Sequence, residues 1–307
     1  MNTRRGIALK LVSILLFSVM AACIKYGREV VPTGEAVFFR SFFAIPPILI
    51  WAIWVGRVGE MVRVNSPLLH VNRGFYGVGA MSCGFLALGL LPLPEAIAIG
   101  YAAPIVATAL AALILREKVR LFRWAAVAVG MVGVLIILWP RMTVLTSGDV
   151  ADQAALGAWV ALIGAVIAGL AKIQIRAMTQ TETTMSIVFW FAVTCTLASL
   201  TTLPLGWVVP DWRAATALVA AGLLGGTAQI LMTESYRHAQ ASTLAPLEYT
   251  SMVWGLGIGF VIFAEIPGIS VLGGAALVIA AGILIIWREH RLGIDTAKAR
   301  AVKTPQG

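Results

Sequence analysis

Ten long apolar segments, separated by short breaks that hold most of the charged residues, run through this chain. The hydrocarbon core of a bilayer is about 30 Å thick, and about 20 helical residues cross it. The segments have about this length and span residues 6–26, 34–56, 71–91, 94–115, 121–139, 154–177, 184–206, 213–236, 243–264 and 268–287. They are too long and too continuous for the alternating strands of a membrane barrel. The sequence therefore predicts an all-α polytopic membrane protein with ten transmembrane helices.

The charge content supports lipid as the solvent for most of the chain. Only 12% of the residues are charged, whereas a soluble domain has about a quarter. The net charge of +9 does not indicate a nucleic-acid partner, because Lys and Arg lie in the breaks and no separate domain remains to bind a polyanion. The first segment lacks a small-residue cleavage site and further segments follow it, so we interpret it as the first helix rather than a signal peptide.

The distribution of positive charges predicts the orientation in the membrane. With a cytoplasmic N-terminus, 18 Lys and Arg residues fall on the cytoplasmic side, Lys10 and Arg73 among them, and four fall on the other side. Loops rich in Lys and Arg stay in the cytoplasm. We therefore predict a multi-pass inner-membrane protein with both termini cytoplasmic. The polar tail, residues 293–307, is expected to be disordered.

The second half of the chain repeats the first at a shift of 148 residues. The shift places Tyr101 on Tyr249, Glu117 on Glu265, Trp139 on Trp287, Gly74 on Gly222 and Gly77 on Gly225. Each half holds five predicted helices, and an odd number means that the second half enters the membrane from the opposite face. We therefore predict two inverted repeats, residues 1–145 and 146–292, an architecture that lets a central cavity open to either side in turn.

The usual signatures of catalysis are missing from the sequence. The three histidines, His70, His238 and His290, fall in different breaks or in the tail, and the three cysteines stand alone in apolar segments. There is no paired metal-ligand or nucleophile motif. We expect no cofactor, no metal site and no enzymatic activity. A small-residue face at Ala126 and Gly130 could serve helix packing or a homodimer contact.

Two charged residues lie deep inside predicted helices, where a charge costs about 2.5–3.5 kcal/mol on insertion scales. Glu248 could line a cavity and bind a substrate amine or imide, or carry a coupling proton; alternatively, it could be a structural partner for a helix end or a cation. For Arg40 we favour a structural or gating role. Each lies about 9 Å from the nearer end of its segment.

Three other acidic residues are interpreted as structural charges. Glu234 precedes Arg237 and His238 by three and four residues, the spacing of a local ion cluster on a helix. Glu117 and Glu265 fall at the ends of matching segments. We expect both to hold loops in place rather than to bind a ligand.

The most polar and aromatic stretch inside a predicted helix runs from Ala245 to Trp254. Pro104 and Pro246 interrupt corresponding helices, and each proline frees a backbone carbonyl at membrane depth. A tyrosine lies near each of them. Aromatic faces with a few placed polar groups suit a planar or amphipathic metabolite. The predicted substrate-binding residues are Tyr101, Glu248, Tyr249, Trp254 and, more weakly, Gln229.

Four local strings carry a family resemblance: "VFFRSFFA" around Arg40, "LREKV" at Glu117, "APLEYTSMVWG" around Glu248 and "FAEIP" at Glu265. With ten helices in two inverted halves, the chain resembles the EamA branch of the drug/metabolite transporter superfamily over residues 6 to about 290. The strings around Arg40 and Glu248 look most like a bacterial subgroup that includes riboflavin and S-adenosylmethionine uptake carriers. Other branches export amino acids and related metabolites.

The resemblance implies secondary transport without ATP, in the inner membrane of a bacterial cell. The cavity would be lined by the first, third, fourth, sixth, eighth and ninth helices. Carried over by position, Tyr101, Tyr249, Glu248 and Trp254 would lie near it, and Arg40 would act through support or gating. The expected function is uptake of riboflavin or a similar heterocyclic metabolite. The alternatives are export of amino acids or related metabolites and, in another class, a membrane scaffold or an intramembrane enzyme.

Overall fold

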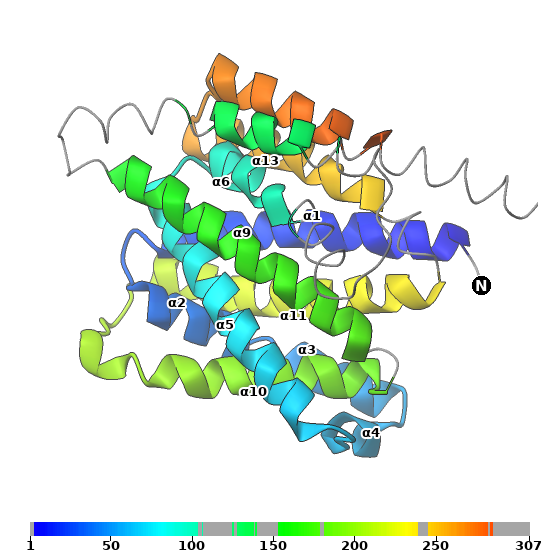
Figure 1. The fold of residues 1–307 in the computed structure, drawn as a ribbon. Helices are drawn as coiled ribbons and strands as arrows, with labels where there is room; N and C mark the ends of the chain where they lie inside the picture. The colour runs from blue at the N-terminus through cyan, green and yellow to red at the C-terminus, as the bar shows by residue number, and fades with distance from the viewer. Residues whose placement is uncertain are drawn as a thin grey trace, which may run out of the picture.

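The computed structural model describes residues 3–103, 106, 125, 128–137, 139, 153–178, 181–238, 245–281 and 283–284 (Figure 1). Within these residues the secondary structure is helical, with no strand, and each of the ten predicted segments contains a helix. The all-α prediction is therefore confirmed. Pro104, Glu117, Ala126 and the tail 293–307 lie outside the described residues.

In the described part of the first half, the chain forms the helices α1 to α6 and one further helix in the fifth segment. Their bounds are α1 Thr3–Gly27, α2 Thr33–Phe42, α3 Ile45–Trp54, α4 Val58–Val62, α5 Pro67–Leu90 and α6 Leu93–Gly100, followed by Ala128–Ile137. The predicted second segment is thus two helices, because Pro46 and Pro47 lack the N–H groups that would continue the α2 ladder. The short α4 was not predicted.

The second half forms a matching series. Its elements are α9 Gln153–Met178, α10 Thr184–Leu200, η1 Leu203–Leu205, α11 Trp212–His238, η2 Ala245–Tyr249, α13 Thr250–Phe263 and the helix Ile269–Ala281. By length and composition, α1, the pair α2–α3, α9 and α11 could each cross a membrane, and four further apolar helices are shorter.

Each helix of the first half that the structure describes packs against a helix of the second half. α1 packs on α11, α5 on α9, α2 on α10 and α6 on α13 (Figure 1). The helices Ala128–Ile137 and Ile269–Ala281 meet at glycines: a Cβ at Gly133 would lie 2.8 Å from the carbonyl oxygen of Gly274. This set of pairs stays the same when the two halves are exchanged, as a twofold relation between the repeats requires.

Buried carboxylates tie the halves together at the starts of two helices. Glu182, before α10, accepts hydrogen bonds from the backbone N–H groups of Asn65 at 3.0 Å and Ser66 at 2.7 Å, just before α5. Glu35 on α2 accepts one from the N–H of Val208, before α11, at 3.1 Å. These contacts satisfy backbone donors near a helix N-terminus, where a negative charge is also favourable.

Two residues that the sequence analysis assigned to the cytoplasmic side are buried in a helix. α5 begins at Pro67, four residues before the predicted segment, so His70 lies inside the helix; Arg73, within the predicted segment but counted as a cytoplasmic charge, is buried as well. The Nε2 atom of His70 lies 3.5 Å from a carboxylate oxygen of Glu182. The charge count that predicted the orientation therefore included side chains that face the protein interior.

Candidate functional site

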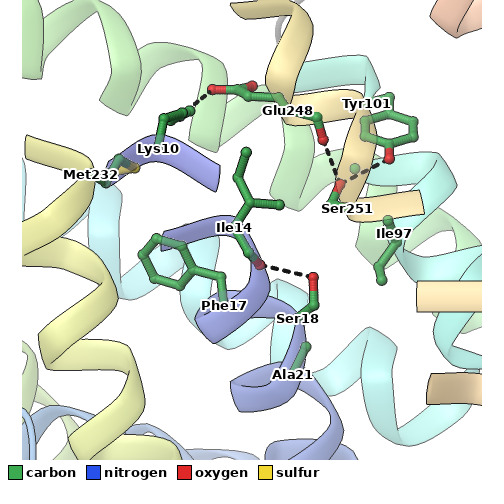
Figure 2. A pocket seen from close by; sticks show the side chains of 11 residues that line it. Lys10, Ile14, Phe17, Ser18, Ala21, Ile97, Tyr101, Met232, Glu248 and Ser251 are labelled. Carbon is green, nitrogen blue, oxygen red and sulfur yellow. Dashed lines mark hydrogen bonds and ion pairs between the residues drawn. The ribbon is translucent and has the colours of Figure 1, made fainter. Parts of the chain in front are cut away.

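A cavity of about 310 Å³ lies between helices of the two halves, at α1, α6, α11, η2 and α13 (Figure 2). Its walls are mostly apolar, with two charged residues and a few hydroxyl groups. The lining residues are Lys10, Ile14, Phe17, Ser18, Ala21, Ile97, Gly100, Tyr101, Met232, Glu248 and Ser251. This volume is at the lower end of the range for small-molecule sites, about 300–1,000 Å³.

The charged residues of the cavity form an ion pair across the repeat. The Nζ atom of Lys10 on α1 lies 3.1 Å from the Oε1 atom of Glu248 on η2, and the two residues are 238 positions apart. The Lys10 side chain is 2% exposed and that of Glu248 is 24% exposed. Each charge compensates the other in an apolar setting, where an isolated charge would be costly.

The backbone around Glu248 is irregular, and nearby hydroxyl groups stabilise it. η2 is a 3₁₀ turn that contains Pro246 and leads directly into α13. Ser251 donates from Oγ to the carbonyl of Glu248 at 2.7 Å, and Thr250 donates to the carbonyl of Leu247 at 2.7 Å. Irregular backbone at membrane depth occurs where it is buried in protein or lines a cavity. The turn thereby presents the Glu248 carboxylate to the cavity.

Tyr101 and Tyr249 meet beside this turn. Their rings pack edge to face, with centroids 5.4 Å apart at an interplanar angle of 67°. The Tyr101 hydroxyl lies 2.8 Å from Ser251 Oγ (Figure 2) and donates a longer hydrogen bond, 3.4 Å, to the Tyr249 carbonyl. Tyr101 lines the cavity. Tyr249 is not a lining residue and packs against the Tyr101 ring.

A second ion pair lies at the far end of α1. Lys25 Nζ lies 3.0 Å from Glu265 Oε1, with side chains 14% and 17% exposed. Lys25 also donates to the carbonyl of Leu91 at 2.6 Å, and Glu265 accepts from the N–H of Leu93 at 2.7 Å. This cluster, which we name the α1-end latch, consists of Lys25, Glu265 and the Leu91–Leu93 turn. It joins α1, the α5–α6 turn and the end of α13.

The latch depends on a strained turn after α13. Ala264 has a φ of +53°, a left-handed conformation that is uncommon for a residue with a Cβ. The Glu265 N–H then donates back to the Gly259 carbonyl at 3.0 Å. This turn directs the Glu265 carboxylate toward α1 rather than away from the bundle.

Arg40 does not reach the cavity. It is buried on α2, with its guanidinium carbon 5.5 Å from the centroid of the Phe191 ring on α10. Arg73 on α5 lies 3.8 Å from the same ring. Within the part of the chain that the structure describes, neither arginine pairs with a carboxylate. The arrangement places Arg40 at the contact of α2, α5 and α10, through cation–π contacts.

The other predicted site residues lie away from the cavity lining. Trp254 on α13 is 39% exposed, and Gln229 is buried on α11. Glu234, in the last turns of α11, has an interaction partner, and the Arg237 side chain lies outside the described residues. The structure thus brings Tyr101, Tyr249 and Glu248 together, while Trp254 and Gln229 lie elsewhere.

Lys10 is the charged cavity residue that the sequence analysis missed. We counted it among the loop charges, although it lies four residues inside the first apolar segment. At four residues it lies only about 6 Å from the end of that segment, so the depth that pointed to Arg40 and Glu248 marks it less strongly. In the described ranges, no group of three or more His, Cys, Asp or Glu residues could hold a metal ion.

Comparison with known proteins shows which protein family this chain resembles. The profile of the EamA-like transporter family matches residues 4–139 and again residues 155–287. The pseudopaline exporter of Pseudomonas aeruginosa is 31% identical over 291 residues, covering 92% of this chain and 94% of that protein. The S-adenosylmethionine uptake transporter of Rickettsia prowazekii is 25% identical, covering 93% and 94%.

Two further similarities are informative. The riboflavin transporter of Rhizobium johnstonii is 27% identical over 262 residues, covering 85% of this chain and 83% of that protein. A solved crystal structure superimposes with a TM-score of 0.65 at 19% identity, covering 95% of this chain and 99% of the other. That likeness shows the fold alone, and the relatives are named as transporters of chemically different molecules.

Proposed function

Since this chain belongs to the EamA-like transporter family, we propose that it is a secondary carrier that moves a small organic metabolite across the inner membrane by alternating access. The observation that carries this proposal is the Lys10–Glu248 ion pair in the cavity between the two halves. Ionisable residues within membrane helices are expensive, and they often mark the pathway of a substrate or proton.

The position of the cavity fits a carrier. α1 and α6 from the first half line it together with α11, η2 and α13 from the second half. In transporters built from inverted repeats, the substrate site lies near the middle of the membrane at the interface of the repeats, beside interrupted helices. The turn at Glu248 is such an interruption.

The α1-end latch supplies one barrier that alternating access would need. Lys25 follows Lys10 by 15 residues on α1, which is about 22 Å along a helix. The latch and the Lys10–Glu248 ion pair are therefore separated by most of the thickness of a bilayer core, and the cavity lining extends between them to Ala21, about one helical turn from Lys25. In our proposal, the latch opens when the cavity becomes accessible from the end of α1.

The substrate and the direction of transport belong to this proposal. Uptake of riboflavin or a similar heterocyclic metabolite stays our prediction from the resemblance, and one relative is named as a riboflavin transporter. Export of amino-acid-related metabolites is the second candidate. It is favoured by the 31% identity with a pseudopaline exporter over 92% of this chain.

Transport in intact cells tests the proposal and separates the two directions. Cells that produce the wild-type protein are compared with cells that produce Glu248→Gln or a matched control, Glu60→Gln, which changes a partly exposed carboxylate on α4, away from the cavity. Labelled riboflavin and S-adenosylmethionine are followed both on entry and on release from preloaded cells. Accumulation supports uptake, and faster release supports export.

If the protein is instead a membrane scaffold, Glu248→Gln should have no effect in the transport assay and should leave the movement of small molecules unchanged. An intramembrane enzyme would convert the labelled compound, which chromatography of the recovered label detects. Loss of movement in Glu248→Gln, at equal amounts of folded protein, supports the carrier.

A further inference from the structure

We propose that the substrate is a zwitterion, an amino acid or amino-acid derivative, whose carboxylate binds Lys10 and whose ammonium group binds Glu248. This inference rests on the proposed carrier function and names the substrate class of the same cavity. Of the two candidate substrates above, it selects the amino-acid-related metabolite over riboflavin. It follows from three features of the site: the burial of the ion pair, its spacing and the apolar walls around it.

The buried ion pair makes the cavity selective for ligands that carry one positive and one negative charge. Lys10 is almost fully buried and its ammonium group lies 3.1 Å from Glu248. A ligand with one charge would bind one member of the pair and draw it away from its counter-charge in an apolar setting, which is unfavourable. A ligand that carries both charges supplies each member with a new partner. A zwitterion therefore avoids the energetic cost that a simple cation or anion meets.

The spacing of the ion pair matches an amino-acid head group. Standard bond lengths place the ammonium nitrogen and the nearer carboxylate oxygen of an α-amino acid roughly 3 Å apart. The Nζ–Oε1 distance of the ion pair is 3.1 Å. The ligand head group can therefore lie beside the Lys10–Glu248 pair in the opposite direction. Its carboxylate then contacts the Lys10 ammonium and its ammonium group contacts the Glu248 carboxylate, which gives two charge-assisted contacts.

The rest of the lining indicates an apolar or aromatic body for the substrate. Ile14, Phe17 and Met232 face the cavity from α1 and α11, and Ile97 and Tyr101 face it from the α6 side (Figure 2). The Tyr101 hydroxyl is already engaged with Ser251, so the ring face is the surface left for a ligand. With a volume of about 310 Å³, the cavity suits a small molecule rather than a peptide.

Other classes of ligand fit the lining less well. Lys10 is the single cation among the lining residues that the structure describes, so a multiply charged phosphate ester would meet one positive and one negative group. A neutral heterocycle would leave the ion pair intact. Its binding would then depend on the apolar walls and not on the charges of Lys10 and Glu248.

Thermal unfolding of the purified full-length protein tests this inference, because a ligand of the folded state raises the melting temperature. The probes are three sets built on the side chains of leucine, methionine and tryptophan. Each set contains the amino acid, the amine that lacks the carboxylate and the acid that lacks the ammonium group. S-adenosylmethionine is added as a larger amino-acid derivative with an additional sulfonium charge, and riboflavin as a neutral heterocycle.

We expect at least one zwitterion to raise the melting temperature, and its single-charge analogues to need at least about a ten-fold higher concentration for the same shift. The variants Lys10→Gln and Glu248→Gln should each lose the response, while Glu60→Gln keeps it. The double variant Lys10→Gln/Glu248→Gln removes both charges without leaving one unbalanced, so it should fold and still fail to respond.

Three results would overturn the inference. One is an equal response to a zwitterion and its single-charge analogue; another is a response that survives in the double variant. The third is a response to none of the zwitterions. A response to riboflavin that is unchanged in the double variant would reject the proposal of a zwitterionic substrate, but it would not contradict the carrier proposal. The carrier proposal fails separately, if Glu248→Gln moves labelled metabolites in cells as the wild type does.

Discussion

Tyr101 and Tyr249, which the 148-residue repeat places in equivalent positions, pack directly against each other with ring centroids 5.4 Å apart. A residue touches its own repeat mate only when both lie close to the axis that relates the two halves. The two tyrosines therefore mark where this axis passes through the bundle. The cavity with Lys10 and Glu248 lies beside them, where movement of one half against the other changes the lining most directly.

The first prediction concerns Glu248. Glu248→Gln keeps the size of the side chain and removes the charge that faces Lys10 at 3.1 Å. Breaking a buried pair at one partner costs about 3–5 kcal/mol at most, and the partial exposure of Glu248 reduces this cost. We expect transport per folded molecule to fall at least about ten-fold. Fluorescence-detected size-exclusion chromatography should report an amount of folded protein within about two-fold of the wild type.

The second prediction concerns the α1-end latch. Lys25→Gln or Glu265→Gln removes an ion pair whose partial burial places its contribution at about 1–2 kcal/mol, between surface and buried pairs. The population that is open at the end of α1 should rise roughly 5- to 30-fold. The labelling rate of a cysteine at Ser18, in the cavity, measures this with an impermeant thiol reagent in a chain from which Cys23, Cys83 and Cys195 have been removed.

The charge-swapped variant Lys25→Glu/Glu265→Lys is the control for the latch. It restores an ion pair with reversed polarity but loses the contacts of Lys25 with the Leu91 carbonyl and of Glu265 with the Leu93 N–H, so it should bring the labelling rate only part of the way back to that of the unmodified latch. If both single variants label at the unmodified rate, the latch is not a barrier to the cavity.

The third prediction concerns the packing of α11 on α2. A Cβ at Gly222 would lie 2.4 Å from the Cβ of Phe43 and 2.8 Å from the carbonyl oxygen of Phe39. Gly222→Ala should therefore destabilise the protein by about 1–3 kcal/mol through overpacking. Gly257 on α13 has open space at the same position, so Gly257→Ala serves as the matched control. Equal melting temperatures for the two variants would contradict the close packing of α11.

The fourth prediction concerns Glu182, which accepts backbone hydrogen bonds before α5. Glu182→Ala removes the acceptor for the N–H groups of Asn65 and Ser66. The expected cost is about 0.5–2 kcal/mol, as for the loss of a helix cap. Glu182→Gln keeps an acceptor oxygen and should cost less. Thermal unfolding of the two variants compares them, and an unchanged melting temperature in Glu182→Ala would reject the capping role.

The length and continuity of the apolar segments made the fold predictable. Ten runs of about 20 residues can be satisfied in lipid only as helices, and the repeat required the halves to be similar. The break at Phe43–Ala44 and the early start of α5 at Pro67 were missed. A local proline changes the backbone without making the segment less hydrophobic, so hydropathy alone does not detect the break.

The candidate site was only partly predictable. Tyr101, Tyr249 and Glu248 drew attention as polar and aromatic residues within apolar segments, and the structure brings them together. Their partner Lys10 lies 238 positions from Glu248, and no local pattern connects two such residues. The pairing of α1 with α11 and of α6 with α13 determines the site, and a single sequence does not reveal these pairings.

The central claim is that the Lys10–Glu248 cavity carries a metabolite, and it can be tested without knowing the substrate. Mass spectrometry compares the small molecules in cells and medium for cells that produce either the wild type or Lys10→Gln/Glu248→Gln at equal levels of folded protein. We predict that the wild type changes the distribution of at least one metabolite between cells and medium, and that the double variant matches cells without the protein. Identical distributions for the wild type and the double variant would contradict the account.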